Sequence, residues 1–120
     1  MIVLPAHGVL KLKASELISD KRLLRDISIT PKQGPKMCIE EIRAGKTLIL
    51  KGTLLLEYLA RPNPKLQERK LYLTAIVSSG DLVRVVIRSL ASSNQLIDAS
   101  IRVGTLTGEV GSTIIPLIEV

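Results

Sequence analysis

Aromatic residues are almost missing from this sequence. Phe and Trp are absent, and Tyr58 and Tyr72 are the only two tyrosines. Hydrophobic residues nevertheless make up 46% of the 120 residues, so a core has to be built mainly from Leu, Ile and Val. A chain of this size and composition can bury such a core without disulfides or metals. We therefore expect one domain, residues 1–120, with an aliphatic interior.

Cysteine and histidine are equally scarce, since Cys38 and His7 are the single examples of each. One thiol cannot form an intramolecular disulfide, and Cys38 has no Cys or His partner at metal-ligand spacing. A Ser-His-Asp set would depend on His7 alone. Glu40 and Glu41 are adjacent, so on a strand they would point to opposite faces and could not share acid-base work. We expect no metal site, no cofactor and no enzymatic activity.

Long apolar runs are missing as well. None approaches the roughly 20 residues that a membrane helix needs, and the opening MIVLPAHG lacks the basic start of a signal peptide. Gly45-Lys46-Thr47 imitates the end of a phosphate-binding loop, but Glu40 stands where that loop requires another glycine. The expectation is a cytoplasmic protein that neither enters a membrane nor acts on a small-molecule substrate.

Positive charge is plentiful, and it is unevenly distributed. Residues 1–70 hold fourteen of the seventeen Lys and Arg against seven of the eleven acids, a net charge of +7, whereas the remainder carries −1. This asymmetry favours an acidic partner, either nucleic acid or an acidic protein surface. With only two tyrosines available for base stacking, nucleic-acid contact would be salt-sensitive and weakly sequence-specific. The candidate contact residues are Lys11, Lys13, Lys21, Arg22, Arg25, Lys65, Arg69 and Lys70.

The pattern of apolar residues is organised around the stretch from Lys70 to Arg102. Residues 71–77 alternate between apolar and polar, residues 78–81 form a polar turn, and residues 82–90 are dense in β-branched side chains, which favour strands. If residues 82–90 are extended, the chain is an all-β protein that forms a single small barrel, closed or partly open. If they form a helix capped by Asp81, an α+β ferredoxin-like fold results.

Further strands flank this centre. Val9 to Lys13 and Ala99 to Thr107 both alternate between apolar and polar residues. Thr113 to Val120 indicates a last strand, and Pro116 predicts that this strand lies at a sheet edge.

Other segments are ambiguous. Thr47 to Ala60 is the most hydrophobic run, and Gly52 in its middle predicts a bulge or bend of a long strand. The part from Thr53 onward is equally compatible with a helix. Ser15 to Asp26 fits one or two helical turns or a charged excursion between strands, and Met37 to Arg43 fits a strand or a helical turn.

The central hairpin AIVSSGDLVRVVIR, from Ala75 to Arg88, resembles a signature of the eighth small subunit of eukaryotic RNA polymerases and of its crenarchaeal counterpart. In that family a strand ending in Ser runs into a turn with Gly, followed by Leu, an apolar residue and Arg or Lys. SNQLIDASIRV looks like the family's loop and final-strand entry, and VLKLKASELISDKRLLRDISI resembles its opening strand, charged excursion and second strand. The similarity covers most of the chain loosely. The matching positions of the hairpin are Ser78 or Ser79, Gly80, Leu82, Val83, Arg84 and Val85.

This resemblance implies a small β-barrel of the oligonucleotide-binding type. It would be a non-catalytic, structural subunit of archaeal DNA-directed RNA polymerase that docks on the largest subunit. The docking hairpin would contain Gly80, Leu82, Val83 and Arg84, and the basic first half would face acidic protein or nucleic acid. The charge alone leaves open a stand-alone barrel that binds single-stranded nucleic acid. A helical segment 82–90 would instead indicate a ferredoxin-like ligand-sensing or dimerisation module.

Overall fold

The computed structural model describes residues 1–106 and 111–120, and this part of the chain consists of strands and one short 3-10 helix. The elements in chain order are β1 (Ile2–Leu4), β2 (Val9–Ala14), β3 (Arg22–Pro31), β4 (Met37–Ala44), β5 (Thr47–Leu55), the 3-10 helix η1 (Leu56–Tyr58), β6 (Arg69–Val77), β7 (Val83–Ser89), β8 (Gln95–Gly104) and β9 (Thr113–Glu119). None of the described residues belongs to a helix that is long and apolar enough to cross a membrane.

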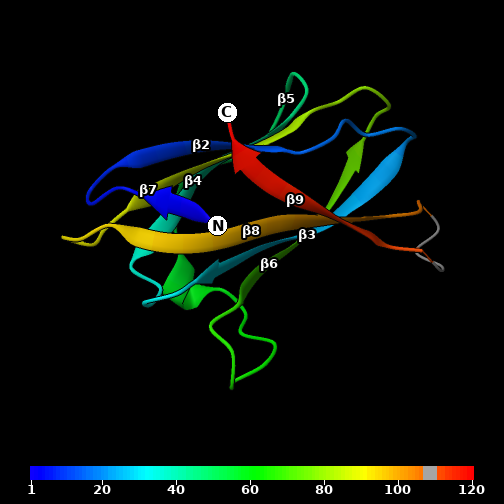
Figure 1. Cartoon of the computed structure of the whole chain (residues 1–120). Helices are drawn as coiled ribbons and strands as arrows, with labels where there is room; N and C mark the ends of the chain where they lie inside the picture. Colours follow the sequence, from blue (N-terminus) through cyan, green and yellow to red (C-terminus); the bar gives the residue numbers. More distant parts are fainter. Residues whose placement is uncertain (107–110) are drawn as a thin grey trace.

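The strands pair in the order β5-β4-β7-β2-β9-β8-β3-β6, and β1 is added beside β8. Figure 1 shows the strands curling into two halves. We call β5, β4, β7 and β2 the β7 sheet, and β8, β3 and β6 with β1 the β3 sheet. Strand β9 joins the two halves, because its first residues pair with β8 and its last residues pair with β2. In Figure 1 it crosses from one half to the other.

The two ends of the strand order, β5 and β6, are not paired with one another, and we call the opening between them the seam. Beside it, an isolated bridge links Ala60 to Lys70 through N–H···O contacts of 3.2 and 2.8 Å. The fold is thus a nearly closed antiparallel barrel, which confirms the all-β prediction and is consistent with a small barrel of the oligonucleotide-binding type. The ferredoxin-like alternative is wrong, because β7 is a strand paired with both β2 and β4.

The interior shows why a chain without Phe or Trp can form this barrel. Alternate residues of a strand point to opposite faces, and the inward positions carry aliphatic side chains. In β7, Val83, Val85 and Ile87 are fully buried, whereas Arg84 and Arg88 are exposed. β-branched residues suit such a half-buried strand. The largest fully buried side chains are Leu4, Leu12, Leu24, Ile27, Ile29, Met37, Ile39, Ile42, Leu56, Ile87, Ile97 and Ile101.

Two glycines shape the β4–β5 hairpin. Gly45 has a φ of +59° and forms the two-residue turn with Lys46 between the paired residues Ala44 and Thr47, a position that favours glycine. The sequence resembling a phosphate-binding loop is therefore a hairpin turn. Gly52 has a φ of +155° and lies where the register of β5 against β4 shifts, so the predicted bulge in this long strand is confirmed.

Two segments that could have been helical are not. Residues 15–21 form no helical turn, because the backbone of Ile18 bonds to Gly80 and Asp81 of the β6–β7 turn instead of to its own neighbours. After Gly52 the chain stays extended to the end of β5, and only η1 coils. Met37 to Arg43, the third ambiguous run, lies in strand β4.

The prediction that Pro116 marks an edge strand is wrong. Strand β9 has neighbours on both sides, and Pro116 stands opposite Ser100 where β9 leaves β8 and approaches β2. The first part of β9 pairs with β8 and the last part pairs with β2. At the point between them, a residue without an N–H is tolerated. Thr107, at the end of the alternating run that starts at Ala99, lies outside the described residues.

Candidate interaction faces

The predicted docking residues lie in the β6–β7 turn and at the start of β7. Gly80 has a φ of +85° in this turn, and its N–H donates to the Ile18 carbonyl at 2.7 Å. The Ile18 N–H donates to the Asp81 carbonyl at 3.0 Å. The Asp81 carboxylate accepts the Ser78 N–H at 2.9 Å. The turn is therefore held firmly against the segment before β3.

The four predicted docking residues differ in exposure. Val83 is fully buried, and Leu82 is half-buried against the core. Gly80 and Arg84 are exposed. Direct contact with a partner is thus open to Arg84 and to the Gly80 backbone, while Leu82 and Val83 fix the hairpin to the barrel.

Arg84 is the middle member of three cations that lie side by side on adjacent strands. It stands directly opposite Lys13 on β2 and directly opposite Arg43 on β4. We call these three residues the cationic row and the outer surface of the β7 sheet the β7 face. Lys11 lies on the same surface, opposite Val86.

Like charges directly opposite one another on neighbouring strands destabilise a sheet. Among the described residues, the cationic row has one ion-pair partner, Glu41, whose Oε2 lies 3.2 Å from Arg43 Nε. Lys13 and Arg84 form no ion pair in this part of the chain. A shallow hollow of about 330 Å³ lies between Lys11, Arg43 and Arg84, and Glu41 also lines it. The β7 face can therefore receive a carboxylate or phosphate without first breaking a pair at Lys13 or Arg84.

The far end of the β7 face is neutralised internally. Arg88 forms an ion pair with Glu40, which lies at a register shift in β4. Arg88 also stands directly opposite Cys38. Cys38 is 1% exposed. Burial raises the pKa of its thiol, the Glu40 carboxylate raises it further, and Arg88 acts in the opposite direction. A buried thiol of this kind is protonated and unreactive at neutral pH.

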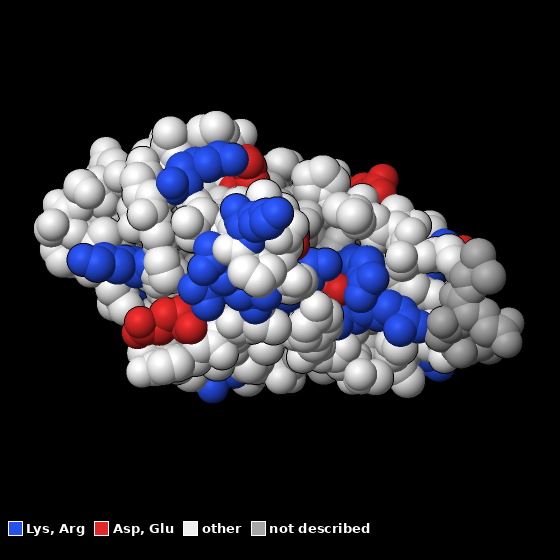
Figure 2. Space-filling view, turned by 90° about the horizontal axis from the view of Figure 1, so that it is seen from below, with Lys and Arg blue, Asp and Glu red and all other residues white. Residues whose placement is uncertain are grey.

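A second basic surface lies on the outside of the β3 sheet, and we call it the β3 face. Tyr72 on β6 and Arg102 on β8 both stand opposite Asp26 of β3. Lys70 lies two residues before Tyr72 and stands opposite Ser28. Figure 2 shows Lys and Arg side chains gathered in a band across this side of the molecule.

Arg25 joins the β3 face because of an irregularity in β3. The register shifts between Leu24 and Asp26, so Arg25 lies in a bulge. Its guanidinium lies over Gly104, and a Cβ at that glycine would overlap Arg25 Nε. The glycine thus leaves room for Arg25 to reach the outer surface beside Arg102.

Three of the other predicted contact residues lie apart from these groups. Lys21 is exposed in the connection before β3. Arg22 lies near the end of the barrel, with Nη2 3.7 Å from the carboxylate of Asp20. Lys65 is exposed in the loop between η1 and β6. The sequence-predicted set is therefore divided between two faces and several connections.

Arg69 has an internal contact that the sequence did not indicate. Its Nη1 donates to the carbonyls of Glu57 at 3.1 Å and Leu59 at 3.4 Å. The neighbouring Lys70 points to the opposite side of β6. Arg69 therefore ties η1 to β6 beside the seam and is poorly placed to contact a partner.

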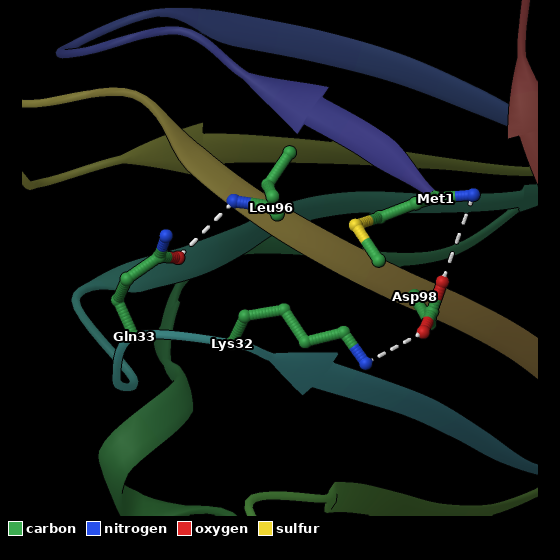
Figure 3. Close-up of polar contacts among 5 residues, drawn as sticks. All are labelled: Met1, Lys32, Gln33, Leu96 and Asp98. Carbon is green, nitrogen blue, oxygen red and sulfur yellow. Dashed lines mark hydrogen bonds and ion pairs between the residues drawn. The ribbon is translucent and has the colours of Figure 1, made fainter.

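Polar contacts fix the start of β8 to the segment after β3, as Figure 3 shows. Lys32 Nζ lies 3.0 Å from Asp98 Oδ2, and the amino group of Met1 lies 3.8 Å from Asp98 Oδ1. The Leu96 N–H donates to Gln33 Oε1 at 3.2 Å. Asp98 is thereby compensated at this end of the β3 face.

Sequence reasoning missed Arg43, Tyr72 and Arg102. Strand alternation does place these side chains on the polar side of their strands, because their neighbours in the chain are apolar. It could not indicate that β4 lies beside β7 or that β3 lies between β6 and β8. In the described residues, no group of three or more His, Cys, Asp or Glu side chains could hold a metal ion.

Comparison of the chain with protein-family models, with curated protein sequences and with solved structures found no match. The two basic faces and the resemblance of the hairpin are therefore the features from which a function can be inferred.

Proposed function

We propose that the protein is a non-catalytic accessory subunit of archaeal DNA-directed RNA polymerase in the cytoplasm, and that it docks on the largest subunit through the β7 face. The observation that carries the proposal is the position of Arg84. This residue ends the Gly80–Arg84 segment that resembles the polymerase family, and it lies between Lys13 and Arg43 in the cationic row. The small barrel that the resemblance implies is consistent with the all-β fold.

The composition of the β7 face supports docking on an acidic protein surface. Carboxylates of a partner would relieve the repulsion within the cationic row, which the described residues relieve only at Arg43. The row is flanked by Ile118, opposite Lys13, and Leu48, opposite Arg43, which are 42% and 44% exposed. Charges set the orientation and the association rate of such an interface, while buried apolar side chains supply affinity.

Affinity purification tests this proposal. The tagged full chain, expressed in cells of its source organism, is expected to recover polymerase subunits. Arg84→Glu reverses the charge at the centre of the cationic row, so the complex should dissociate at a lower salt concentration. Arg61→Glu makes the same substitution in an exposed loop and is the matched control. Recovery of the wild-type chain without polymerase subunits would refute the proposal, and equal loss with both variants would refute the role of the β7 face.

A further inference from the structure

Tyr72 is an exposed aromatic ring in the middle of a strand. It is 55% exposed and stands on the β3 face, separated from Arg102 only by the position of Asp26. Lys70 lies on the same side of β6. Packing does not account for a large ring at this position, because its strand neighbours Leu71 and Leu73 already face the core. A ring among cations is the combination that holds a nucleobase and its phosphates.

The acidic side chains of the β3 face are already engaged. Asp26 is 2% exposed, and its Oδ2 lies 2.7 Å from Arg102 Nε. The carboxylate of Glu68 accepts a hydrogen bond of 2.6 Å from the Ser28 hydroxyl. The cations of this face that form no ion pair with any described residue are Arg25 and Lys70. The Glu68 carboxylate keeps its charge, because a hydroxyl donor does not neutralise it. Two unpaired cations against this one carboxylate leave the described part of the surface with a net positive charge, in agreement with the band in Figure 2.

A hollow extends the face beyond Lys70. It has a volume of about 360 Å³ and lies between Thr30 at the end of β3 and the loop that carries Lys65 and Leu66. Leu66 is 53% exposed, so the hollow offers an apolar side chain beside a cation. From Thr30 to Arg25 the strand spans roughly 16 Å at about 3.3 Å per residue, a length that can hold several nucleotides.

We infer that the β3 face binds single-stranded nucleic acid. Tyr72 supplies the platform on which a base stacks, Lys70, Arg102 and Arg25 contact the phosphates, and the hollow beside Lys65 receives the neighbouring nucleotide. This surface belongs to the other half of the barrel from the β7 face, so the inference does not depend on the docking proposal. An acidic peptide would satisfy the cations but would make no use of the exposed ring.

Fluorescence anisotropy with the purified full chain tests the inference. The probes are labelled oligo(dT) and oligo(U) of roughly 12 nucleotides, within the range that one small barrel covers, and they distinguish DNA from RNA. Tyr72→Ala should weaken binding by about 5- to 140-fold, which is the stacking contribution of roughly 1–3 kcal/mol converted at 1.4 kcal/mol per tenfold. Tyr72→Phe should retain binding, because the ring remains.

A salt series separates stacking from phosphate contact. On a single strand, each phosphate that a cation neutralises adds about 0.7 to the slope of log affinity against log salt. Lys70→Ala should therefore reduce the slope by about 0.7, whereas Tyr72→Ala should leave it unchanged. Tyr58→Ala changes a ring that is 78% exposed beside the seam, and Lys13→Ala changes a cation of the β7 face. Both controls should bind like the wild type.

Three kinds of result would overturn the inference. Absence of binding to both probes at low salt would exclude a nucleic-acid site. Equal weakening by Tyr72→Ala and Tyr58→Ala, or by Lys70→Ala and Lys13→Ala, would exclude the β3 face. Competition by poly-glutamate as effective as that by unlabelled oligo(dT) would show that the surface recognises acidic protein instead.

Discussion

The ion pair between Asp26 and Arg102 is the residue-scale contact on which the β3 sheet depends most. Asp26 is buried, and among residues 1–106 and 111–120 only Arg102 forms an ion pair with it. Removing one partner of a buried pair leaves an uncompensated charge. Arg102→Met should therefore lower the free energy of unfolding by roughly 3 kcal/mol, measured by urea denaturation.

The double variant Asp26→Leu/Arg102→Met is the control for this prediction. Replacing both partners with apolar side chains removes the buried charge together with its partner, so most of the lost stability should return. A double variant that is less stable than Arg102→Met alone would contradict this account of the pair.

Cys38 leads to a pH-dependent prediction at the same scale. Burial raises the pKa of its thiol above the ordinary value of 9.0, and Glu40 adds to this. The thiol ionises at a lower pH in the unfolded chain than in the folded chain. The contribution of the neutral Cys38 thiol to the free energy of unfolding is therefore complete below pH 9.0 and is lost as the pH rises further. Urea denaturation should show a smaller decline above that pH for Cys38→Val than for the wild type. An identical decline in both proteins would contradict the prediction.

Lys70 and Arg69 show why the candidate sites were only partly predictable from sequence. Both are cations at the start of the same strand, and the sequence treats them alike. Their roles differ because strand side chains alternate, which directs Lys70 outward and Arg69 toward the carbonyls of Glu57 and Leu59. That direction follows from the register of β6 against β3, which is a long-range property.

At the scale of elements, the contact of Arg69 with η1 secures the chain beside the seam. Arg69→Met removes two hydrogen bonds from a charged donor to the backbone, so the free energy of unfolding should fall by about 1.5–3 kcal/mol. Hydrogen exchange at the amides of Ala60 and Lys70, which bridge to one another, should become faster. Lys70→Met, which changes the adjacent outward side chain, should leave this exchange unchanged. Equal acceleration in both variants would contradict the assigned role of Arg69.

Local pattern predicted the elements that depend on neighbours in the chain. The extended conformation of β7 and the bulge at Gly52 both follow from side-chain shape and backbone freedom. The position of β9 does not. The edge rule for proline assumes one partner strand along the whole length, whereas β9 changes partner at Pro116. The sequence has no local mark of such a change.

For the whole molecule, β9 is the element that turns two sheets into a barrel. A chain lacking residues 113–120 keeps the pairs within each sheet but loses the connection between β8 and β2. Such a chain should expose the aliphatic core, bind the dye ANS and lose its cooperative thermal transition. Addition of a synthetic peptide of residues 111–120 should restore the transition. A truncated chain that unfolds cooperatively on its own would contradict this role of β9.

The same connection has a consequence for synthesis. Until residues 113–119 have folded into place, β2 and β8 each have an unpaired edge that could recruit a foreign strand. Lysines and other charges on an unpaired rim discourage such pairing, and β2 carries Lys11 and Lys13. We therefore expect Lys11 and Lys13 to protect the edge of β2 against aggregation until β9 is in place.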